Sequence, residues 1–316
     1  MGTPRVLVTG CAGYIGSVLT GLLLEKGCHV IGVDNLIYNN GNAVLGHLGC
    51  PRFEFFRDDV RDIDKLRYLI DRCDVVVPLA AIVGAPACDS HPEYAVAVNQ
   101  EAIVSMVKLV CPQKRIISVN TNSGYGATDG TRFCTETDPL NPISVYGKTK
   151  CEAERAVLTH SNSVSLRLAT VFAASPRMRM DLMVNDFVCE ILSEAAMEIF
   201  EPHFKRNFVH VRDVAKAIFY MIGKPHLKGV FNVGLPDANL TKMELAWKIC
   251  DDVGMSRECI CIGTGRDEDQ RNYLVSSQKL LDTGFRFEKT LSDGIREVRQ
   301  ICSMFYQFEL ASMRNV

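Results

Sequence analysis

The chain has 316 residues, of which 47% are hydrophobic and 23% are charged, and its formal net charge is −2 at pH 7. This composition is typical of a globular protein with one large or two modest domains. The balanced charge argues against a nucleic-acid or membrane-surface binder, and no window approaches the roughly 20 uninterrupted apolar residues of a membrane helix.

The 13 cysteines are odd in number and scattered along the chain. No Cys-x-x-Cys pair occurs, and Cys259 and Cys261 lack the second pair that would complete a zinc site, so no metal is predicted. Free cysteines of this kind predict a reducing compartment. Because the first ten residues run into a strand pattern without a signal peptide, we expect a cytoplasmic protein.

Strand and helix signals alternate through the first half of the chain. Short β-branched or continuously apolar runs predict strands, and apolar residues three and four apart predict helices. In chain order they are a strand at 5–10, a helix at 13–28, strands at 29–35, 53–60 and 74–81, a helix at 91–110, a strand at 115–123, a helix at 144–160 and a strand at 164–172. Such alternation indicates an α/β fold whose parallel sheet is covered on both faces.

After residue 172 the alternation is less regular. Helices are predicted at about 181–195, 211–223, 241–253 and 290–305, with short strands near 207–210 and 230–233. We therefore predict a Rossmann-type, doubly wound domain over 1–172, to which 207–234 returns, and a smaller α+β lobe over 173–316.

Three glycines follow the first predicted strand in the stretch TGCAGYIG, namely Gly10, Gly13 and Gly16. The early glycines would allow a tight turn close to a pyrophosphate, the last would let the helix pack closely on the strand, and the helix N-terminus would supply N–H donors. A lone glycine pattern also fits an ordinary strand-to-helix turn. Its place at the start of a βαβ unit favours a dinucleotide site.

Asp34 ends the second predicted strand, 18 residues after Gly16. A carboxylate there can accept both hydroxyls of an adenosine ribose and would repel a 2′-phosphate, which predicts NAD rather than NADP. Considered alone, Asp34 would be interpreted as an aspartate that caps a turn.

Tyr146 and Lys150 lie four residues apart on a predicted helix and therefore share a face. A nearby ammonium favours the phenolate and would lower the pKa of Tyr146. A phenolate available near neutral pH can take a proton from a sugar hydroxyl, so the pair is a candidate for general base catalysis.

Together these features resemble the extended short-chain dehydrogenase/reductase family, in its NAD-dependent epimerase/dehydratase group that acts on nucleotide sugars. The resemblance covers essentially the whole chain and rests on TGCAGYIG, VDN, DDVRD (58–62), PLAA (78–81), Asn99, TNSGYG (121–126), YGKTK (146–150) and RNFVHVRDVAKAI (206–218). It implies a Rossmann domain with tightly bound NAD or NADH, a C-terminal lobe for the nucleotide sugar, and a homodimer through the helices at 91–110 and 144–160.

The resemblance also implies roles for single residues. The implied catalytic residues are Thr121, Tyr146 and Lys150. The implied cofactor-binding residues are Gly10, Gly13, Tyr14, Ile15, Gly16, Asp34, Asn35, Asp59, Val60, Leu79, Ala80, Ala81, Asn99, Tyr146 and Lys150. The candidate nucleotide-sugar contacts are Cys88, Asn122, Ser123, Arg179, Asp181, Asn185, Arg206, Arg266 and Arg271, with Arg206 placed on the pyrophosphate. Two positions depart from the family pattern, since Pro78 replaces a histidine and Thr170 replaces an asparagine.

The loop after Thr121 bears on the type of reaction. Relatives that remove water across carbons 5 and 6, and relatives that decarboxylate, carry an acid in this loop, whereas this chain has Asn122 and Ser123. Neither shuttles a proton near neutral pH. Oxidation at carbon 4 is therefore favoured over 4,6-dehydration and decarboxylation. The 4-keto product would either be released or be reduced again from its other face.

Further stretches, among them AAIVGAP and SPRMRMDLMVNDF, resemble a subgroup that includes a GDP-heptose 4-dehydrogenase. In that enzyme the bound cofactor is reoxidised by a small keto acid. The resemblance thus implies a nucleotide-sugar 4-dehydrogenase, with a 4-epimerase as the alternative. A noncatalytic NAD-binding protein on the same fold is an alternative from a different class.

Cys88 follows the fourth predicted strand, on the side where ligands bind in such sheets. It would be either an acid/base thiol beside a carbonyl or a buried, inert thiol. His91 and His210 are further candidate bases, and the apolar run NFVHV favours a core role for His210.

Overall fold

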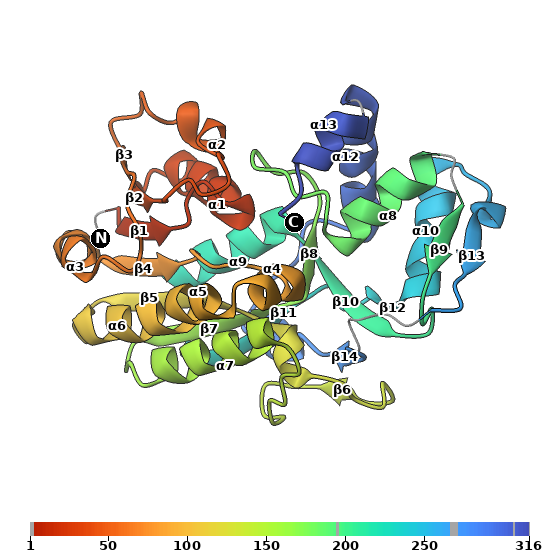
Figure 1. The fold of residues 1–316 in the computed structure, drawn as a ribbon. Helices are drawn as coiled ribbons and strands as arrows, with labels where there is room; N and C mark the ends of the chain where they lie inside the picture. Colours follow the sequence, from red (N-terminus) through yellow and green to blue (C-terminus); the bar gives the residue numbers. More distant parts are fainter. Residues whose placement is uncertain (1–2, 194–195, 266–270, 306, 316) are drawn as a thin grey trace.

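The structure is a computed structural model that describes residues 3–193, 196–265, 271–305 and 307–315. Seven parallel strands form its main sheet in the order β11-β7-β5-β4-β1-β2-β3 (Figure 1). They are β1 (Arg5–Thr9), β2 (His29–Val33), β3 (Phe53–Phe56), β4 (Val75–Pro78), β5 (Arg115–Thr121), β7 (Ser163–Leu168) and β11 (Gly229–Val233). The predicted doubly wound, Rossmann-type sheet is confirmed, and its strand order reverses between β1 and β4.

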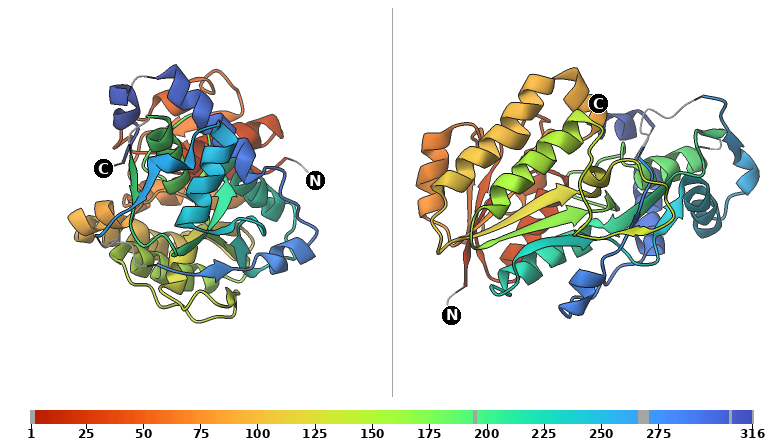
Figure 2. Two further views of the ribbon diagram at one scale, coloured as in Figure 1. Left: turned by 90° about the vertical axis from the view of Figure 1, so that its right-hand side faces the viewer. Right: turned by 90° about the horizontal axis from the view of Figure 1, so that it is seen from below.

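Helices cover both faces of this sheet, which with its helices forms the first lobe (Figure 2). On one face α1 (Tyr14–Glu25) packs against α9 (Val211–Ile222), and on the other α6 (Ala102–Leu109) packs against α3 (Ile63–Asp71) and α7 (Val145–Leu158). The remaining short helices are α2 (Asn42–Leu45), α4 (Ala85–Ser90), α5 (Pro92–Val96), the π-helix η1 (Ala97–Glu101) and the 3₁₀-helix η2 (Asn122–Tyr125). Two separate apolar clusters, one on each face, bury the sheet.

The second lobe has its own apolar cluster, around which α8, α10 and α12 pack. Its helices are α8 (Met183–Leu192), α10 (Lys242–Val253), the 3₁₀-helix η3 (Arg257–Cys259), α12 (Leu291–Met304) and α13 (Gln307–Ser312), whereas α11 (Gln278–Asp282) packs on β11 of the main sheet. Its small sheets are β12-β10-β8, β13-β9 and β14-β6, formed by β6 (Phe133–Cys134), β8 (Thr170–Phe172), β9 (Met197–Ile199), β10 (Lys205–His210), β12 (Asn239–Thr241), β13 (Ile260–Ile262) and β14 (Leu274–Val275).

Several predicted elements differ in the structure. The strands expected at 53–60 and 74–81 are shorter and end at Phe56 and Pro78. The strand expected at 164–172 is divided at Ala169, whose N–H bonds to Val233, so that β7 stays in the main sheet while β8 joins the second lobe. The helix expected at 91–110 contains a π-turn between α5 and α6. The strand expected at 115–123 ends at Thr121, because its side chain accepts a hydrogen bond from the N–H of Ser123 and starts η2. The boundaries of the two predicted domains stay a prediction.

Candidate active site

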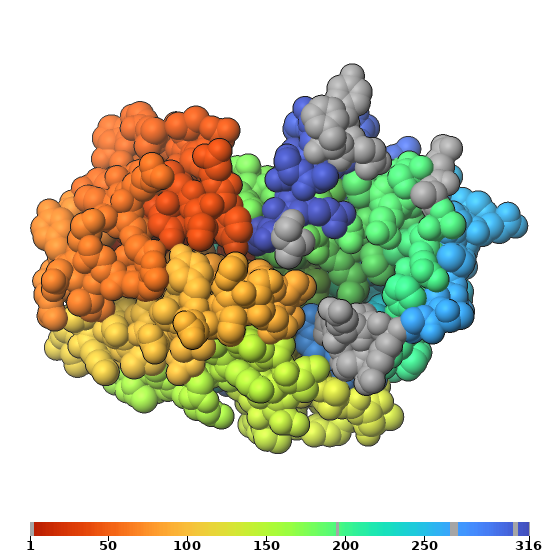
Figure 3. Space-filling model, viewed as in Figure 1, coloured from red at the N-terminus to blue at the C-terminus, as the bar shows by residue number. Residues whose placement is uncertain are grey.

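A cleft of about 1150 Å³ lies where the carboxyl ends of the central strands meet the second lobe. Gly10 after β1, Ala80 after β4 and Thr121 at the end of β5 all line it. The space-filling view shows a hollow between the N-terminal part of the chain, in red and orange, and the C-terminal part, in green and blue (Figure 3). Ligands bind at this place in doubly wound sheets, because the strand order reverses there.

Most of the predicted site residues come together in this cleft. Those that line it are Gly10, Gly13, Tyr14, Ile15, Gly16, Asp34, Asn35, Asp59, Val60, Leu79, Ala80, Ala81, Thr121, Ser123, Tyr146, Lys150, Arg179, Asp181, Arg206 and Arg271. Four others, Cys88, Asn99, Asn122 and Asn185, are buried behind its wall. Arg266 lies outside the described residues.

The glycine turn has no room for side chains. Gly10 has a φ of +69°, and a Cβ there would lie 2.7 Å from the backbone nitrogen of Ala80. A Cβ on Gly16 would lie 1.9 Å from the carbonyl oxygen of Gly10. The N-terminus of α1 therefore packs directly on the turn, and the backbone itself forms the floor of the cleft. This cradle fits the pyrophosphate of a dinucleotide.

Asp34 both caps a turn and lines the cleft. One carboxylate oxygen accepts a hydrogen bond from the N–H of Ala12 at 3.0 Å, and the other accepts one from the N–H of Leu36 at 2.9 Å. Burial raises its pKa, and these hydrogen bonds oppose the rise. Because a carboxylate offers about four lone-pair positions, two remain for ribose hydroxyls.

Asn35 and Asp59 form one unit beside Asp34. The amide of Asn35 donates to Asp59 at 3.2 Å, and Arg61 donates to the same carboxylate through Nε at 2.9 Å and Nη2 at 3.0 Å. The hydrogen bonds from Arg61 lower the pKa of Asp59 to about 2. Asp59 is therefore a fixed anion on this wall at neutral pH.

Asn99 was predicted to touch the cofactor, but the structure places it behind the cleft. Its Oδ1 accepts from the N–H of Ile82 at 2.8 Å, and its Nδ2 donates to the carbonyl of Ile82 at 2.9 Å. It lies in the π-helix η1, and such turns are frequent at functional sites. Asn99 thus fixes Ile82, which lines the cleft, and its contact with the cofactor stays a prediction.

Tyr146 and Lys150 line the cleft from α7, as the four-residue spacing predicted. Burial raises the pKa of Tyr146 to about 12, and the cations that oppose this rise are Arg179 and Arg271. The cations that lower the pKa of Tyr146 are thus these two arginines of the second lobe, and not Lys150 as the four-residue spacing predicted. Burial lowers the pKa of Lys150 itself to about 8, while Glu154, one turn along α7, raises it.

Glu154 belongs to a buried ion pair that the sequence did not reveal. Its carboxylate accepts from Arg167 at 2.6 Å and from Ser165 at 2.6 Å, and the two charged side chains are 2% and 7% exposed. Arg167 also donates to the hydroxyl of Tyr125 in η2 at 3.0 Å. The pair thus ties the helix of Tyr146 and Lys150 to the loop that follows Thr121.

Thr121 is linked to the second lobe through its neighbour. Its hydroxyl donates to Ser123 Oγ at 2.8 Å, and the guanidinium of Arg271 donates to the same oxygen. Between them, Asn122 is fully buried, with its amide paired to the carbonyl of Arg167 and to the N–H of Ala169. The side chain of Asn122 therefore lies behind the cleft wall in this structure, and its role as a substrate contact stays a prediction.

Arginines and acids dominate the second-lobe wall. Arg179 forms a bidentate pair with Asp181, so two predicted ligand contacts bind each other. Arg206, 1% exposed, donates to the carbonyl of Lys205 at 3.0 Å and to that of Arg271. Asn185 is buried behind this wall, where it accepts from the N–H of Ala173 at 3.0 Å and donates to the carbonyl of Arg179 at 2.8 Å. Asn185 therefore holds the backbone of Ala173 and Arg179 in place, and its role as a ligand contact stays a prediction.

Cys88 does not reach the cleft. It is fully buried, its thiol donates to the carbonyl of Ile82 at 3.3 Å, and burial raises its pKa to about 11. Of the two predicted interpretations, the structure favours the inert thiol. His210 is also buried and caps α9 by accepting from the N–H of Arg212 at 3.1 Å, while His91 is exposed at the surface.

Several lining residues were not predicted, among them Tyr38, Arg177, Arg314 and Asn315. They come from the loop after Asp34, from the segment after β8 and from residues 314–315. Arg177 lies within the stretch SPRMRMDLMVNDF, but no motif marks the other three. Among the described residues no group of three or more His, Cys, Asp or Glu side chains could hold a metal ion, and no helix is long and apolar enough to cross a membrane.

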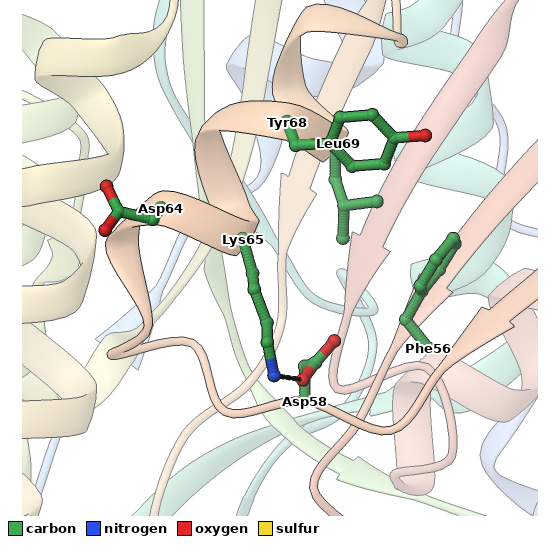
Figure 4. A pocket seen from close by; sticks show the side chains of 6 residues that line it. All are labelled: Phe56, Asp58, Asp64, Lys65, Tyr68 and Leu69. Atoms are coloured by element: carbon green, nitrogen blue, oxygen red, sulfur yellow. Dashed lines mark hydrogen bonds and ion pairs between the residues drawn. The ribbon is translucent and has the colours of Figure 1, made fainter.

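A smaller pocket of about 440 Å³ lies between β3 and α3. Figure 4 shows Lys65 reaching from α3 to Asp58, with Phe56, Tyr68 and Leu69 around them. Asp58 lines both pockets, but the small one contains none of the predicted catalytic or cofactor residues. We therefore place the chemistry in the large cleft.

Comparisons with known proteins agree with this geometry. Residues 6–234 match the NAD dependent epimerase/dehydratase family. A Bacillus subtilis protein described as the uncharacterised UDP-glucose epimerase YtcB is 32% identical over 250 residues, which cover 73% of this chain and 76% of that protein. The dTDP-glucose 4,6-dehydratase of Bacillus anthracis, solved with NAD, has a TM-score of 0.83 at 23% identity, covering 96% of this chain and 97% of that one. The UDP-glucuronic acid 4-epimerase of Bacillus cereus, solved with UDP-glucuronic acid and NAD, has a TM-score of 0.82 at 24% identity, covering 96% and 100%.

Proposed function

The chain belongs to the NAD-dependent epimerase/dehydratase family, and we propose that it is an NAD-dependent oxidoreductase that acts at carbon 4 of a nucleotide sugar. One observation carries the proposal: Thr121, Tyr146 and Lys150 line the same cleft as the glycine turn, while η2 after Thr121 contains no acid. Bound NAD would supply the hydride acceptor. Asp34, together with the backbone at Gly10 and Gly16, is proposed to hold it.

In this mechanism Tyr146 takes the proton from the hydroxyl on carbon 4, and the hydroxyl of Thr121 holds that oxygen. Because burial opposes the phenolate, the positive charges of Arg179 and Arg271 are needed to favour it. Lys150, held on α7 one turn from Tyr146, is proposed to hold the nicotinamide ribose. Arg206 and Arg271 are proposed to bind the pyrophosphate of the sugar nucleotide.

The fate of the 4-keto product distinguishes two activities. Release of the product would make the chain a nucleotide-sugar 4-dehydrogenase, which the resemblance to the GDP-heptose 4-dehydrogenase subgroup supports, with a small keto acid as reoxidant. Reduction from the other face would make it a 4-epimerase, which the names of the Bacillus subtilis and Bacillus cereus relatives support. Dehydration and decarboxylation are less well supported, because Asn122 and Ser123 replace the loop acid.

The redox state of the copurified cofactor tests the proposal first. Samples of the native protein are taken before and after incubation with a small keto acid, and then with UDP-, GDP- and CDP-sugars. Each sample is denatured, and the absorbance of the released reduced nicotinamide is read. NADH that is oxidised by the keto acid and re-formed with one sugar indicates a 4-dehydrogenase and identifies its substrate. Bound NAD with no net redox change, but with a new sugar isomer, indicates a 4-epimerase. Absence of any nicotinamide cofactor would contradict both.

Tyr146→Phe tests the proposed base. We expect kcat to fall by roughly 10² to 10⁴-fold with cofactor still bound, because only the hydroxyl is removed. Tyr68→Phe, which changes an exposed tyrosine outside the cleft, is the matched control. Full turnover by Tyr146→Phe would exclude the mechanism.

We also propose a homodimer through α5, α6 and α7, which the family resemblance implies for the helices expected at 91–110 and 144–160. Light scattering at micromolar concentration measures the mass of the assembly. A monomer under those conditions would contradict the proposal.

A further inference from the structure

The last described residues of the chain line the cleft. Residues 313–315, which we call the C-terminal segment, follow α13, and Arg314 and Asn315 are part of the cleft wall. Figure 1 shows the C-terminus between the two lobes, close to α4 and to the loop before α8. The segment thus lies beside the proposed ligand site, although it is far in sequence from every motif that predicted the site.

Contacts with the second lobe hold the segment in place. Leu310, 3% exposed, belongs to the apolar cluster of that lobe, and Met313 packs against the same cluster. The carbonyl of Met313 accepts from the N–H of Met180 at 3.0 Å. The guanidinium of Arg314 donates to the carboxylate of Asp186 in α8, which also lines the cleft. Backbone, apolar and charged contacts therefore fix the segment together.

A second set of contacts leads from the segment across the cleft. The side-chain oxygen of Asn315 accepts from the guanidinium of Arg177, and that guanidinium lies 4.9 Å from the centre of the Tyr38 ring. Tyr38 belongs to the first lobe, four residues after Asp34. Arg177 therefore joins the two lobes beside the carboxylate proposed to hold the adenosine ribose. A cation over an aromatic ring and a charge-assisted hydrogen bond are both favourable, and more so when partly buried.

We propose that Arg314 and Asn315 are positioning residues for the dinucleotide: they hold Arg177 against Tyr38, so that the two lobes stay joined over the adenosine half of the cofactor and its release is slowed. The inference rests on the proposed function. A cofactor that is reduced in one half of the reaction and reoxidised in the other has to remain bound between them. Slow release is thus a requirement of either proposed activity.

The test measures how fast NADH leaves the full-length protein. NADH fluorescence is followed after addition of excess NAD, for the parent chain, for the double variant Arg314→Ala/Asn315→Ala, and for a chain that ends at Met313. We expect dissociation to become roughly tenfold faster in both variants, because a charge-assisted hydrogen bond and the contact it supports are lost. Arg299→Ala, an exposed arginine on α12, is the control and should release NADH like the parent.

The two proposals fail in different ways. If the parent binds NADH and both variants release it within about twofold of the parent rate, the role of the segment is wrong while the proposed function stands. If the parent binds no NADH, the proposed function is wrong and this inference with it. Thermal unfolding of the unliganded proteins separates a local effect from general destabilisation, since only the latter would lower the melting temperature of the double variant markedly. Faster release together with such a fall would also overturn the inference.

Discussion

The two walls of the cleft are built differently. The floor of the first-lobe wall is the backbone of the glycine turn, where Gly10 and Gly16 pack closely on neighbouring backbone atoms, and side chains such as Asp34 and Tyr146 line the rest of it. The second-lobe wall consists of long charged side chains, such as Arg179 paired with Asp181 and Arg314 paired with Asp186. Backbone cannot yield to an added methyl group, whereas long side chains can rearrange. Substitutions in the glycine turn should therefore cause large losses of stability and cofactor binding, whereas substitutions in the second-lobe wall should weaken ligand binding by degrees.

Substitution in the glycine turn should have the largest effect. In Gly16→Ala the new Cβ would lie 1.9 Å from the carbonyl oxygen of Gly10, so the turn has to move. We expect a loss of about 3 kcal/mol in the free energy of unfolding, measured in urea, and loss of the copurified cofactor. Gly21→Ala on the same helix is the matched control, because its Cβ would meet only the His47 ring at 3.7 Å. Equal losses of stability and cofactor in Gly16→Ala and Gly21→Ala would show that the close backbone contact at Gly16 is not the cause.

Lys150→Met should stabilise the protein while abolishing turnover. Burial lowers the pKa of Lys150 from 10.5 to about 8, so the folded state holds this proton less tightly than the unfolded state does. Burying the charged ammonium therefore destabilises the folded state by its full amount below pH 8. This destabilisation shrinks as the pH rises from 8 to 10.5 and is absent above pH 10.5. We therefore expect the variant to be more stable by about 2 to 3 kcal/mol at pH 7 and by much less near pH 11.

Urea unfolding at both pH values measures this difference. Lys148→Met, an exposed lysine on the same helix, is the control and should change little at either pH. A stability gain for Lys150→Met that is the same at pH 7 and pH 11 would mean that packing, and not charge burial, is responsible.

A conservative change in the second-lobe wall should have an intermediate effect. Arg206→Lys keeps the charge but loses the planar fork that suits a pyrophosphate. We expect KM for the sugar nucleotide to rise by about tenfold, with little change in kcat. Arg132→Lys, at an exposed position, is the control. An unchanged KM would remove Arg206 from the proposed pyrophosphate site.

Removal of the buried thiol should have the smallest effect on catalysis. Cys88→Ala takes away a group that lies behind the wall with a pKa raised to about 11. We expect kcat to stay within about twofold of the parent value, with a modest loss of stability from the small cavity. A fall of a hundredfold or more, with the fold intact, would instead indicate an acid/base thiol.

Local patterns in the sequence determined the main sheet, the glycine turn, the position of Asp34 and the Tyr146–Lys150 pair. Each depends on spacing within one turn or one βαβ unit, so neighbouring residues suffice to specify it. The family resemblance placed Asn99, Asn122, Asn185 and Cys88 in the site, but position in the sequence shows only which loop or helix a residue occupies and not which way its side chain points. In the structure all four point into the wall and satisfy buried backbone groups.

Only the tertiary structure decided the second-lobe wall and the cations that act on Tyr146. Arg177 and Arg179 come from the loop before α8, whereas Arg271 and Arg314 come from two later segments, and their pairing depends on how the two lobes meet across the cleft. The split of 164–172 between two sheets and the buried Glu154–Arg167 pair have the same origin. The charge around a side chain and its burial depend on whichever residues the fold brings near it. Because those residues are distant in the sequence, no local pattern predicts either property.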